Sequence, residues 1–243
     1  MRNILIGADP ELFLVDPNSG EFVSAHNLIP GTKYDPHPVQ YGAVQVDGTA
    51  AEFNIDPAAN SEEFSRNIYA VLDSLRNMVP GYNLSVSPTA TYNKSYFEKD
   101  IPPDAKRLGC DPDFNAWTCL ENPQPNPGKV PFRTGAGHIH IGWTTGQDVY
   151  DADHYLECAR VARQMDYYLG IWSLLWDPDP TRRNLYGKAG AFRPKGYGME
   201  YRVMSNAWLK SSILINWVYE AAISGMRALD SNGAAEMFHK DTG

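Results

Sequence analysis

Four short segments of this chain carry polar side chains two positions apart inside otherwise apolar stretches. They are Asp9-Pro10-Glu11, Glu52-Phe53-Asn54, His138-Ile139-His140 and Glu200-Tyr201-Arg202. Successive side chains of a β-strand point to opposite faces, so residues at i and i+2 share one face. Each segment therefore reads as a strand with one apolar core face and one charged or imidazole face. Burying such a polar face costs free energy unless a metal ion or an opposite charge compensates it.

If these strands are neighbours in one sheet, their carboxylates, imidazoles and arginine meet at one place. Oxygen-rich ligand sets suit magnesium or manganese, whereas sets led by histidine and thiolate suit zinc. Glycines flank the histidine pair in Gly135-Ala136-Gly137-His138-Ile139-His140, and they let a ligand or another backbone come close. The sequence therefore predicts a divalent-cation site that also takes an anionic substrate, with phosphate as the leading expectation.

Each motif taken alone has a more ordinary interpretation. Asp9-Pro10 is a frequent turn signal, and a lone strand glutamate such as Glu52 is usually solvated. His138 and His140 also fit a pair of satisfied core histidines. A turn would explain Asp9. It would not explain Glu11, which begins an apolar stretch, and this favours a ligand role for Glu11.

The composition is that of a globular protein that can bury a sizeable core. Of its 243 residues, 43% are hydrophobic and 12% are aromatic. The formal net charge of −8 argues against nucleic-acid binding, which leaves a basic footprint. Three cysteines without a CxxC pair, and no secretory h-region at the N-terminus, predict a cytoplasmic location. The most apolar stretch, Ile213 to Met226, is too short to span a bilayer, so no membrane partner is expected.

Hydrophobic periodicity predicts helices at residues 61–79, 151–176 and 210–229. Strands are predicted at residues 3–15, 22–23, 39–46, 50–55, 83–92 and 132–143 and around the Glu-x-Arg pair. The polar pairs are scattered along nearly the whole chain, so the site needs all of it. We therefore expect one domain, residues 1–243, of the α+β class. Its sheet should be curved and mainly antiparallel, with the helices on the convex face.

Two segments fall outside this periodic pattern. Residues 98–135 are rich in proline and aperiodic, and a loop that long is usually functional, so we expect it to cover the site as a lid. Residues 231–243 are small and polar and are expected to fray.

A basic, glycine-rich segment precedes the Glu-x-Arg strand. It contains Arg182, Arg183, Lys188, Arg193 and Lys195. The usual fate of such a run is a solvated loop. Beside a carboxylate-rich metal strand it favours phosphate binding, because arginine donates bidentate hydrogen bonds. No GxxxxGK[ST] segment is present, so the chain is not a P-loop enzyme.

The order of these strands, helices and the basic loop resembles the glutamine synthetase and glutamate–cysteine ligase superfamily. Four motifs resemble more closely the phage-encoded COOH–NH2 ligases of amidoligase type 2. They are Gly7-Ala8-Asp9-Pro10-Glu11, Val46-Asp47-Gly48-Thr49-Ala50-Ala51-Glu52-Phe53-Asn54-Ile55, Gly109-Cys110-Asp111-Pro112-Asp113 and Tyr197-Gly198-Met199-Glu200-Tyr201-Arg202. The resemblance covers roughly residues 5–228 and implies a glutamine-synthetase-like catalytic domain.

The resemblance also implies roles for single residues. Asp9, His138 and Glu200 match ligands of the cation that bridges the nucleotide phosphates. Glu11 and Glu52 match ligands of the cation near the substrate carboxylate, with Asp47 as an open further ligand. Arg193 matches a phosphate-contacting arginine, and Arg202 matches the arginine that meets the reacting carboxylate or phosphate. Arg183, Lys188 and His140 are expected to help Arg193 bind ATP.

The implied activity is that of an ATP-dependent carboxylate–amine ligase that works through an acyl phosphate, with Mg²⁺ or Mn²⁺. Its partners would be a small-molecule or peptide carboxylate and an amine, whose identities stay open, as does the oligomeric state. One alternative is a metal-dependent hydrolase that activates water at His138 and His140. Another is a phage interaction protein without catalysis, which leaves the four polar strand pairs unexplained.

Overall fold

The computed structural model describes residues 3–103, 105–106, 112–123 and 130–231. Within them the strands are β1 (Leu5–Val15), β2 (Phe22–Val23), β3 (His37–Val39), β4 (Gly42–Asp47), β5 (Ala50–Ile55), β6 (Asn83–Ser85), β7 (Thr89–Thr91), β8 (Phe114–Asn115), β9 (Leu120–Glu121), β10 (Phe132–Thr134), β11 (Gly137–Gly142), β12 (Ala191–Lys195) and β13 (Gly198–Tyr201). The helices are α1 (Ser61–Met78), α2 (Lys94–Lys99), α3 (Ala152–Met165), α4 (Ile171–Ser173), α5 (Pro180–Leu185) and α6 (Ser212–Asp230). A π-helical turn, Asp166–Gly170, follows α3, and a 3-10 helix, Asn206–Lys210, precedes α6.

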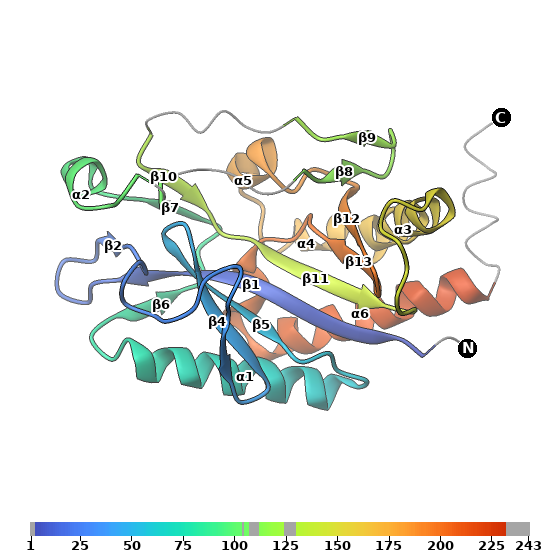
Figure 1. The fold of residues 1–243 in the computed structure, drawn as a ribbon, viewed down its shortest axis with the longest axis horizontal. Helices are drawn as coiled ribbons and strands as arrows, with labels where there is room; N and C mark the ends of the chain where they lie inside the picture. The colour runs from blue at the N-terminus through green and yellow to red at the C-terminus, as the bar shows by residue number, and fades with distance from the viewer. Residues whose placement is uncertain (1–2, 104, 107–111, 124–129, 232–243) are drawn as a thin grey trace.

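One large sheet organises the fold, with strand order β3-β4-β5-β1-β11-β13-β12-β8-β9 (Figure 1). β2 and β6 pair with β1 off this path, and β7 pairs with β10 in a separate two-stranded sheet. All the named strand pairs are antiparallel. The predicted α+β class and mainly antiparallel sheet are confirmed. The predicted curvature of the sheet and its likeness to glutamine synthetase are not confirmed.

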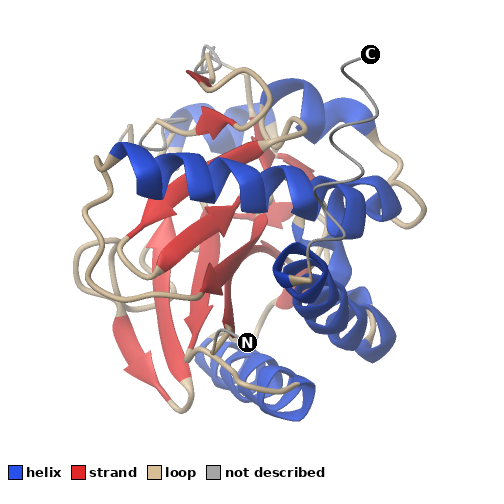
Figure 2. Ribbon diagram, turned by 90° about the vertical axis from the view of Figure 1, so that its right-hand side faces the viewer, coloured by secondary structure: helices blue, strands red, loops and turns tan. Residues whose placement is uncertain are grey.

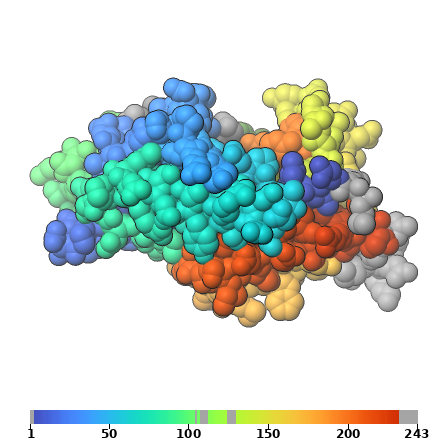
Figure 3. Space-filling model, turned by 90° about the horizontal axis from the view of Figure 1, so that it is seen from below, coloured from blue at the N-terminus to red at the C-terminus, as the bar shows by residue number. Residues whose placement is uncertain are grey.

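One face of the sheet carries the main core. Side chains that alternate along β1, such as Ile6, Leu12 and Leu14, are fully buried there against residues of α1, α3 and α6. Figure 2 shows the strands as a layer with helices packed against it. In Figure 3 α1 and α6 lie side by side along the lower face of the molecule. α1, α3 and α6 thus cover one face, and the polar groups of the strands are left on the other.

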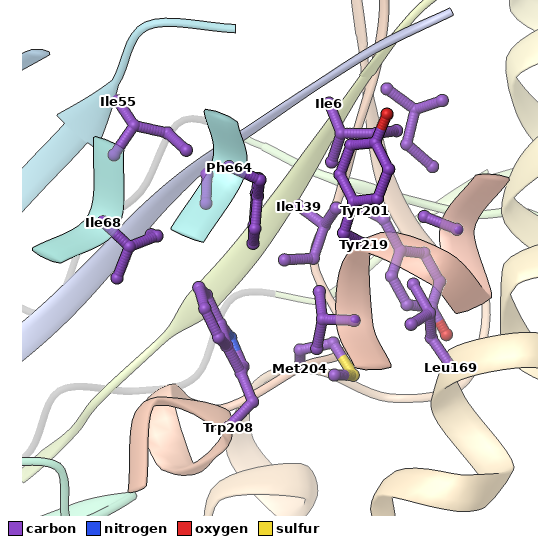
Figure 4. Packing of buried hydrophobic residues seen from close by; sticks show 14 of the residues in the cluster. Ile6, Ile55, Phe64, Ile68, Ile139, Leu169, Tyr201, Met204, Trp208 and Tyr219 are labelled. Atoms are coloured by element: carbon purple, nitrogen blue, oxygen red, sulfur yellow. The ribbon is translucent and has the colours of Figure 1, made fainter. Parts of the chain in front are cut away.

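Large side chains fill the space between this face and the helices (Figure 4). Phe64 of α1 stacks on Trp208 with ring centroids 6.1 Å apart, and both side chains are fully buried. The Trp208 indole Nε1 donates a hydrogen bond to the carbonyl of Gly137 at 3.0 Å, directly before the histidine pair. The core therefore fixes the position at which β11 presents its histidines.

A smaller apolar cluster lies on the polar face, at one end of the sheet. It joins Phe13 of β1 to residues around β7 and α2, including Tyr92 and Phe97. Arg133 of β10 stacks its guanidinium over the Phe97 ring at 4.7 Å. This cluster forms an end wall for the polar face.

Several predicted boundaries are wrong. The strand predicted at residues 132–143 is divided into β10 and β11, which belong to different sheets. The strand predicted at residues 83–92 is likewise divided, because β6 pairs with β1 and β7 pairs with β10. The helix predicted at residues 151–176 is interrupted by the π-helical turn at Asp166–Gly170. The strand breaks follow from which strands pair with one another, and hydrophobic periodicity does not encode this pairing.

The segment predicted as an aperiodic lid contains regular structure in its described part. The strands β8, β9 and β10 lie within residues 98–135. α2 and α5 are two short helices that periodicity did not predict. Residues 232–243, predicted to fray, lie outside the described residues, and both the lid and the single-domain organisation stay predictions. None of the helices in the described residues combines the length and apolar character needed to cross a membrane.

Candidate functional site

Strand register brings the predicted site residues onto one face of the sheet. Asp9 of β1 lies opposite His138 of β11, and His140 lies opposite Glu200 of β13. Arg193 of β12 lies opposite the other side of Glu200. Because these partners occupy directly opposed positions, the polar groups of four strands form a row across the sheet.

Asp9, His138, His140 and Glu200, which we call the central cluster, are linked by short contacts between their side chains. His138 Nδ1 lies 3.3 Å from Asp9 Oδ1 and 3.2 Å from Glu200 Oε1. His140 Nε2 lies 3.1 Å from the same Asp9 oxygen. Possible ligand atoms of Asp9, His140 and Glu200 all lie within 4.8 Å of one another. A single cation can therefore be reached by several members of this cluster.

Two atoms of the central cluster are buried without a hydrogen-bond partner. They are Asp9 Oδ1 and His140 Nε2, which are close together but lack hydrogen-bond geometry. Buried polar atoms are normally satisfied, so each orphaned atom needs an explanation. A carboxylate oxygen and an imidazole nitrogen are both good ligands for Mg²⁺ or Mn²⁺. The residues present thus fit a divalent cation at this point.

The charges of the central cluster are mutually stabilised. Burial alone would raise the pKa of Asp9, but His140 and His138 lower it to about 2. Burial would lower the pKa of His140, yet the Asp9 carboxylate raises it. Burial also acts against ionised Glu200, but Arg202 and His138 bring its pKa well below the ordinary value. At neutral pH the two carboxylates are therefore ionised.

Glu200 is the point where the basic residues converge. Its side chain is 1% exposed, and its Oε2 lies 3.2 Å from Arg193 Nη1 and 3.0 Å from Lys195 Nζ. Arg202 Nη1 donates to Oε1. The structure therefore brings predicted Arg193 and Arg202 to the central cluster, together with Lys195. Tyr197, which sequence reasoning did not assign, is hydrogen-bonded through its hydroxyl to His140 Nδ1.

Glu11 and Glu52 form a second acidic group beside the central cluster. The two residues are directly opposed across β1 and β5. Glu11 Oε2 accepts from the Ala136 N–H at 3.0 Å, and Glu52 Oε2 accepts from Gln45 Nε2 at 2.6 Å. Burial and then the charge of Asp47 raise the pKa of Glu11 to about 7. Burial and the charges of Asp9 and Asp47 raise the pKa of Glu52 well above its ordinary value.

Burial first, and neighbouring carboxylates second, thus disfavour the ionised forms of Glu11 and Glu52. The pKa of Asp47 is also raised by burial, and Asp47 lines the same cavity as Glu11. Hard divalent cations compensate such groups through carboxylate oxygens. The acidic group therefore fits a second cation, and Asp47 remains an open further ligand.

A cavity opens on each side of the central cluster. The first, about 70 Å³, reaches His138 and is lined by Glu11, Asp47 and three arginines, namely Arg133, Arg182 and Arg202. The second, about 610 Å³, reaches His140 and Tyr197 and is lined mainly by apolar and small polar residues. The central cluster thus lies between a narrow charged cavity and a wider apolar one.

Two of the arginines at the narrow cavity are buried, and no carboxylate of the described residues forms an ion pair with either. Arg133 is 5% exposed and Arg182 is 2% exposed. Their terminal nitrogens donate to backbone carbonyls, such as Val203 O for Arg182 and Phe132 O for Arg133. The Nε atoms of both are buried and unpaired. Sequence reasoning missed Arg133, because only the pairing of β10 with β7 places it here.

Asp113, in the motif before β8, also reaches the site. Arg202 Nε donates to Asp113 Oδ2 at 3.0 Å. The motif was part of the predicted resemblance, but no role was assigned to this carboxylate from the sequence.

The two other predicted nucleotide-binding residues lie differently. Arg183 donates from Nη1 to the Asp177 carbonyl at 2.6 Å and from Nη2 to Ser173 Oγ at 2.9 Å, so its guanidinium ties α5 to α4. The Lys188 side chain is exposed in the turn before β12. Their roles in ATP binding stay predictions.

Residues 125–224 match the family model of the phage phiEco32-like COOH.NH2 ligase-type 2. The resemblance to these ligases is thus confirmed over that part of the chain. The matched part contains the histidine pair, the basic segment and the Glu-x-Arg strand, whereas the acidic residues of β1 and β5 lie outside it. A comparison with curated proteins gave no match. The family match supports a carboxylate–amine ligase.

Proposed function

We propose that this chain is an ATP-dependent carboxylate–amine ligase of the glutamine synthetase superfamily. The observation that carries the proposal is the placement of the central cluster between two cavities of different chemistry. A ligase of this kind must hold a nucleotide and a carboxylate on opposite sides of the transferring phosphoryl group. A metal-dependent hydrolase needs only one such site.

The wider cavity suits the nucleoside of ATP. Its lining includes Trp143 and Ile55, which offer apolar surface to a base, and Thr144 and Asn54, which offer hydrogen-bonding groups. Ligand pockets commonly combine such an apolar wall with a few polar groups. From this cavity the phosphates would extend over His140 toward Arg193 and Lys195.

The narrow cavity suits the carboxylate substrate. The guanidinium groups of Arg133 and Arg182 are buried, each with an unpaired Nε atom, and an anion in this cavity would stabilise them. Arg202 lines the same cavity and also touches Glu200, so an anion there would lie beside the central cluster. This arrangement favours a carboxylate that faces the terminal phosphate of ATP.

The proposed reaction has two chemical steps. A carboxylate oxygen attacks the γ-phosphorus and ADP leaves, which gives an acyl phosphate. An amine then attacks the carbonyl carbon, the C–O bond to phosphate breaks, and the amine proton is lost as the amide forms. Mg²⁺ or Mn²⁺ held by Asp9, Glu11, Glu52, His138 and Glu200, with His140 as a further ligand, would screen the repulsion between the two anions. Arg193 would hold ATP phosphates, and Arg202 would stabilise the charge on the reacting group.

The test is incubation with ATP, Mg²⁺ and pools of carboxylates and amines, followed by mass spectrometry. We expect a new amide together with ADP and phosphate, and none of the three without ATP. A matched reaction with Glu200→Gln should give no product. Hydrolysis of a pool member in the absence of ATP would instead support the metal-dependent hydrolase.

A further inference from the structure

Asp113 lies directly before β8, and its carboxylate is held from both sides. Arg202 Nε donates to Oδ2, and Asn122 Nδ2 donates to Oδ1 at 3.0 Å. The Asp113 side chain is 15% exposed and that of Arg202 is 5% exposed. Charge-assisted hydrogen bonds of this kind are strong when water is largely excluded.

The β8–β9 hairpin that follows Asp113 is anchored by contacts that do not involve the Asp113 side chain. β8 pairs with β12, and the Ala116 N–H donates to the Gly190 carbonyl at 2.8 Å. The Trp117 indole donates to the buried carboxylate of Asp166 at 2.6 Å. The anchors hold the hairpin body, so Asp113 at its leading edge can exchange partners without unfolding it.

Arg202 is engaged on two edges by internal carboxylates. Arg202 Nη1 donates a hydrogen bond to Glu200, and Arg202 Nε donates one to Asp113. A substrate carboxylate or phosphoryl group binds a guanidinium best through two parallel N–H groups, so one internal partner has to yield. Glu200 is almost fully buried among three cations, whereas Asp113 is partly exposed at the end of a hairpin. Asp113 is therefore the partner that can leave.

We propose that Asp113 is a displaceable carboxylate, which neutralises Arg202 in the free protein and gives that guanidinium up to the anionic group of the substrate. The proposal rests on the proposed function, because it takes Arg202 as the arginine that meets the reacting group. An anion then binds only if its contacts outweigh those of an internal competitor. Asp113 would thus be a specificity-determining residue that disfavours weakly held anions at the reacting position.

The test measures binding of inorganic phosphate by calorimetry, which needs neither ATP nor turnover. Asp113→Asn keeps the shape of the side chain and an oxygen acceptor for Asn122, but it removes the competing charge. A hydrogen bond to a charged group contributes enough that phosphate affinity should rise roughly tenfold or more. The same substitution in an Arg202→Met background should not raise the phosphate affinity, because the guanidinium for which Asp113 and phosphate compete is absent.

Glu121→Gln is the matched control, since Glu121 is an exposed residue of the same hairpin. It removes one negative charge without touching Arg202, and phosphate affinity should change little. Unchanged or weaker phosphate binding in Asp113→Asn would overturn the proposal. So would an equal gain in Glu121→Gln, or a gain that survives the loss of Arg202.

A second measurement needs no substitution at Asp113. In protein labelled with 15N-arginine, the Arg202 Nε–H signal, identified from its loss in Arg202→Lys, should shift as phosphate is added. A signal that stays fixed at saturating phosphate would refute the exchange. If the phosphate gain is seen but no amide is ever made from ATP, the proposed function fails and the exchange stands.

Discussion

Glu11 and Glu52 face each other across β1 and β5, with no basic side chain between them in strand register. Like charges directly opposed on a sheet are destabilising. Burial and the charge of Asp47 raise the pKa of Glu11, and burial and the charges of Asp9, Asp47 and Glu11 raise the pKa of Glu52. A cation bound between the two carboxylates would therefore favour their ionised forms.

The first prediction concerns stability against pH without metal. Glu11 has a folded-state pKa of about 7 against an ordinary 4.5, so the folded protein binds this proton more tightly than the unfolded chain. Stability in EDTA should therefore fall as pH rises from about 4.5 to about 7 and should stay low above that. His140, whose pKa is also raised, contributes with the same sign.

The contribution of Glu11 to the pH dependence of stability is obtained by comparing the parent with Glu11→Gln. Urea denaturation at pH 5 and pH 8 should show a smaller pH dependence in Glu11→Gln than in the parent. Glu220→Gln, at an exposed position of α6, should behave like the parent. Addition of Mg²⁺ at pH 8 should stabilise the parent more than Glu11→Gln. Identical pH dependence in the parent and in Glu11→Gln would contradict the account of this pair.

The second prediction concerns Glu200. This carboxylate is buried and compensates Arg193, Lys195 and Arg202. Glu200→Gln keeps the shape but leaves these cations uncompensated, and breaking a buried pair costs about 3–5 kcal/mol. Denaturation should show a loss of that order, and calorimetry should show weakened binding of magnesium–nucleotide. Undiminished magnesium–nucleotide binding would mean that Glu200 is not a ligand.

The third prediction separates the two arginines. Arg202→Lys keeps the charge but loses the fork that contacts Asp113 and Glu200. ATP affinity should stay within a few-fold of the parent, whereas amide formation should fall by roughly 10²-fold, the scale of one lost charge stabiliser. Arg193→Ala should instead weaken ATP binding directly. Equal losses of ATP affinity in both variants, with no separate loss of turnover, would reverse these assignments.

The fourth prediction concerns the support behind the site. Tyr201, between Glu200 and Arg202, donates from its hydroxyl to Asp166 Oδ1 at 2.7 Å, and both residues are buried. Tyr201→Phe leaves the Asp166 carboxylate with one donor fewer, which costs about 1–3 kcal/mol. Tyr150→Phe is the control, because Tyr150 is exposed. Equal stability of the two variants in urea would show that the Asp166 contact contributes nothing.

The sharing of one sheet face by the polar residues was predictable from the sequence, whereas several strand and helix boundaries were not. Residues two apart on a strand share a face by geometry alone, so the pairing of Asp9 with Glu11 and of His138 with His140 on one face was predictable. Which strands become neighbours is decided by long-range packing, so Arg133 and the contact between Asp113 and Arg202 were not. Arg183 shows a second kind of limit, since its position in a basic run led to a predicted role in ATP binding. A basic run in sequence does not reveal that one of its members donates to Ser173 and Asp177.

The most direct test of the ligase proposal follows oxygen atoms from the carboxylate substrate. The protein is incubated with ATP, Mg²⁺, an amine pool and carboxylates labelled with 18O, and the released phosphate is analysed by mass spectrometry. An acyl phosphate transfers one carboxylate oxygen to phosphate, so we predict phosphate that carries one 18O atom, formed together with amide and ADP. Amide formed with unlabelled phosphate, or product formed without ATP, would contradict the account.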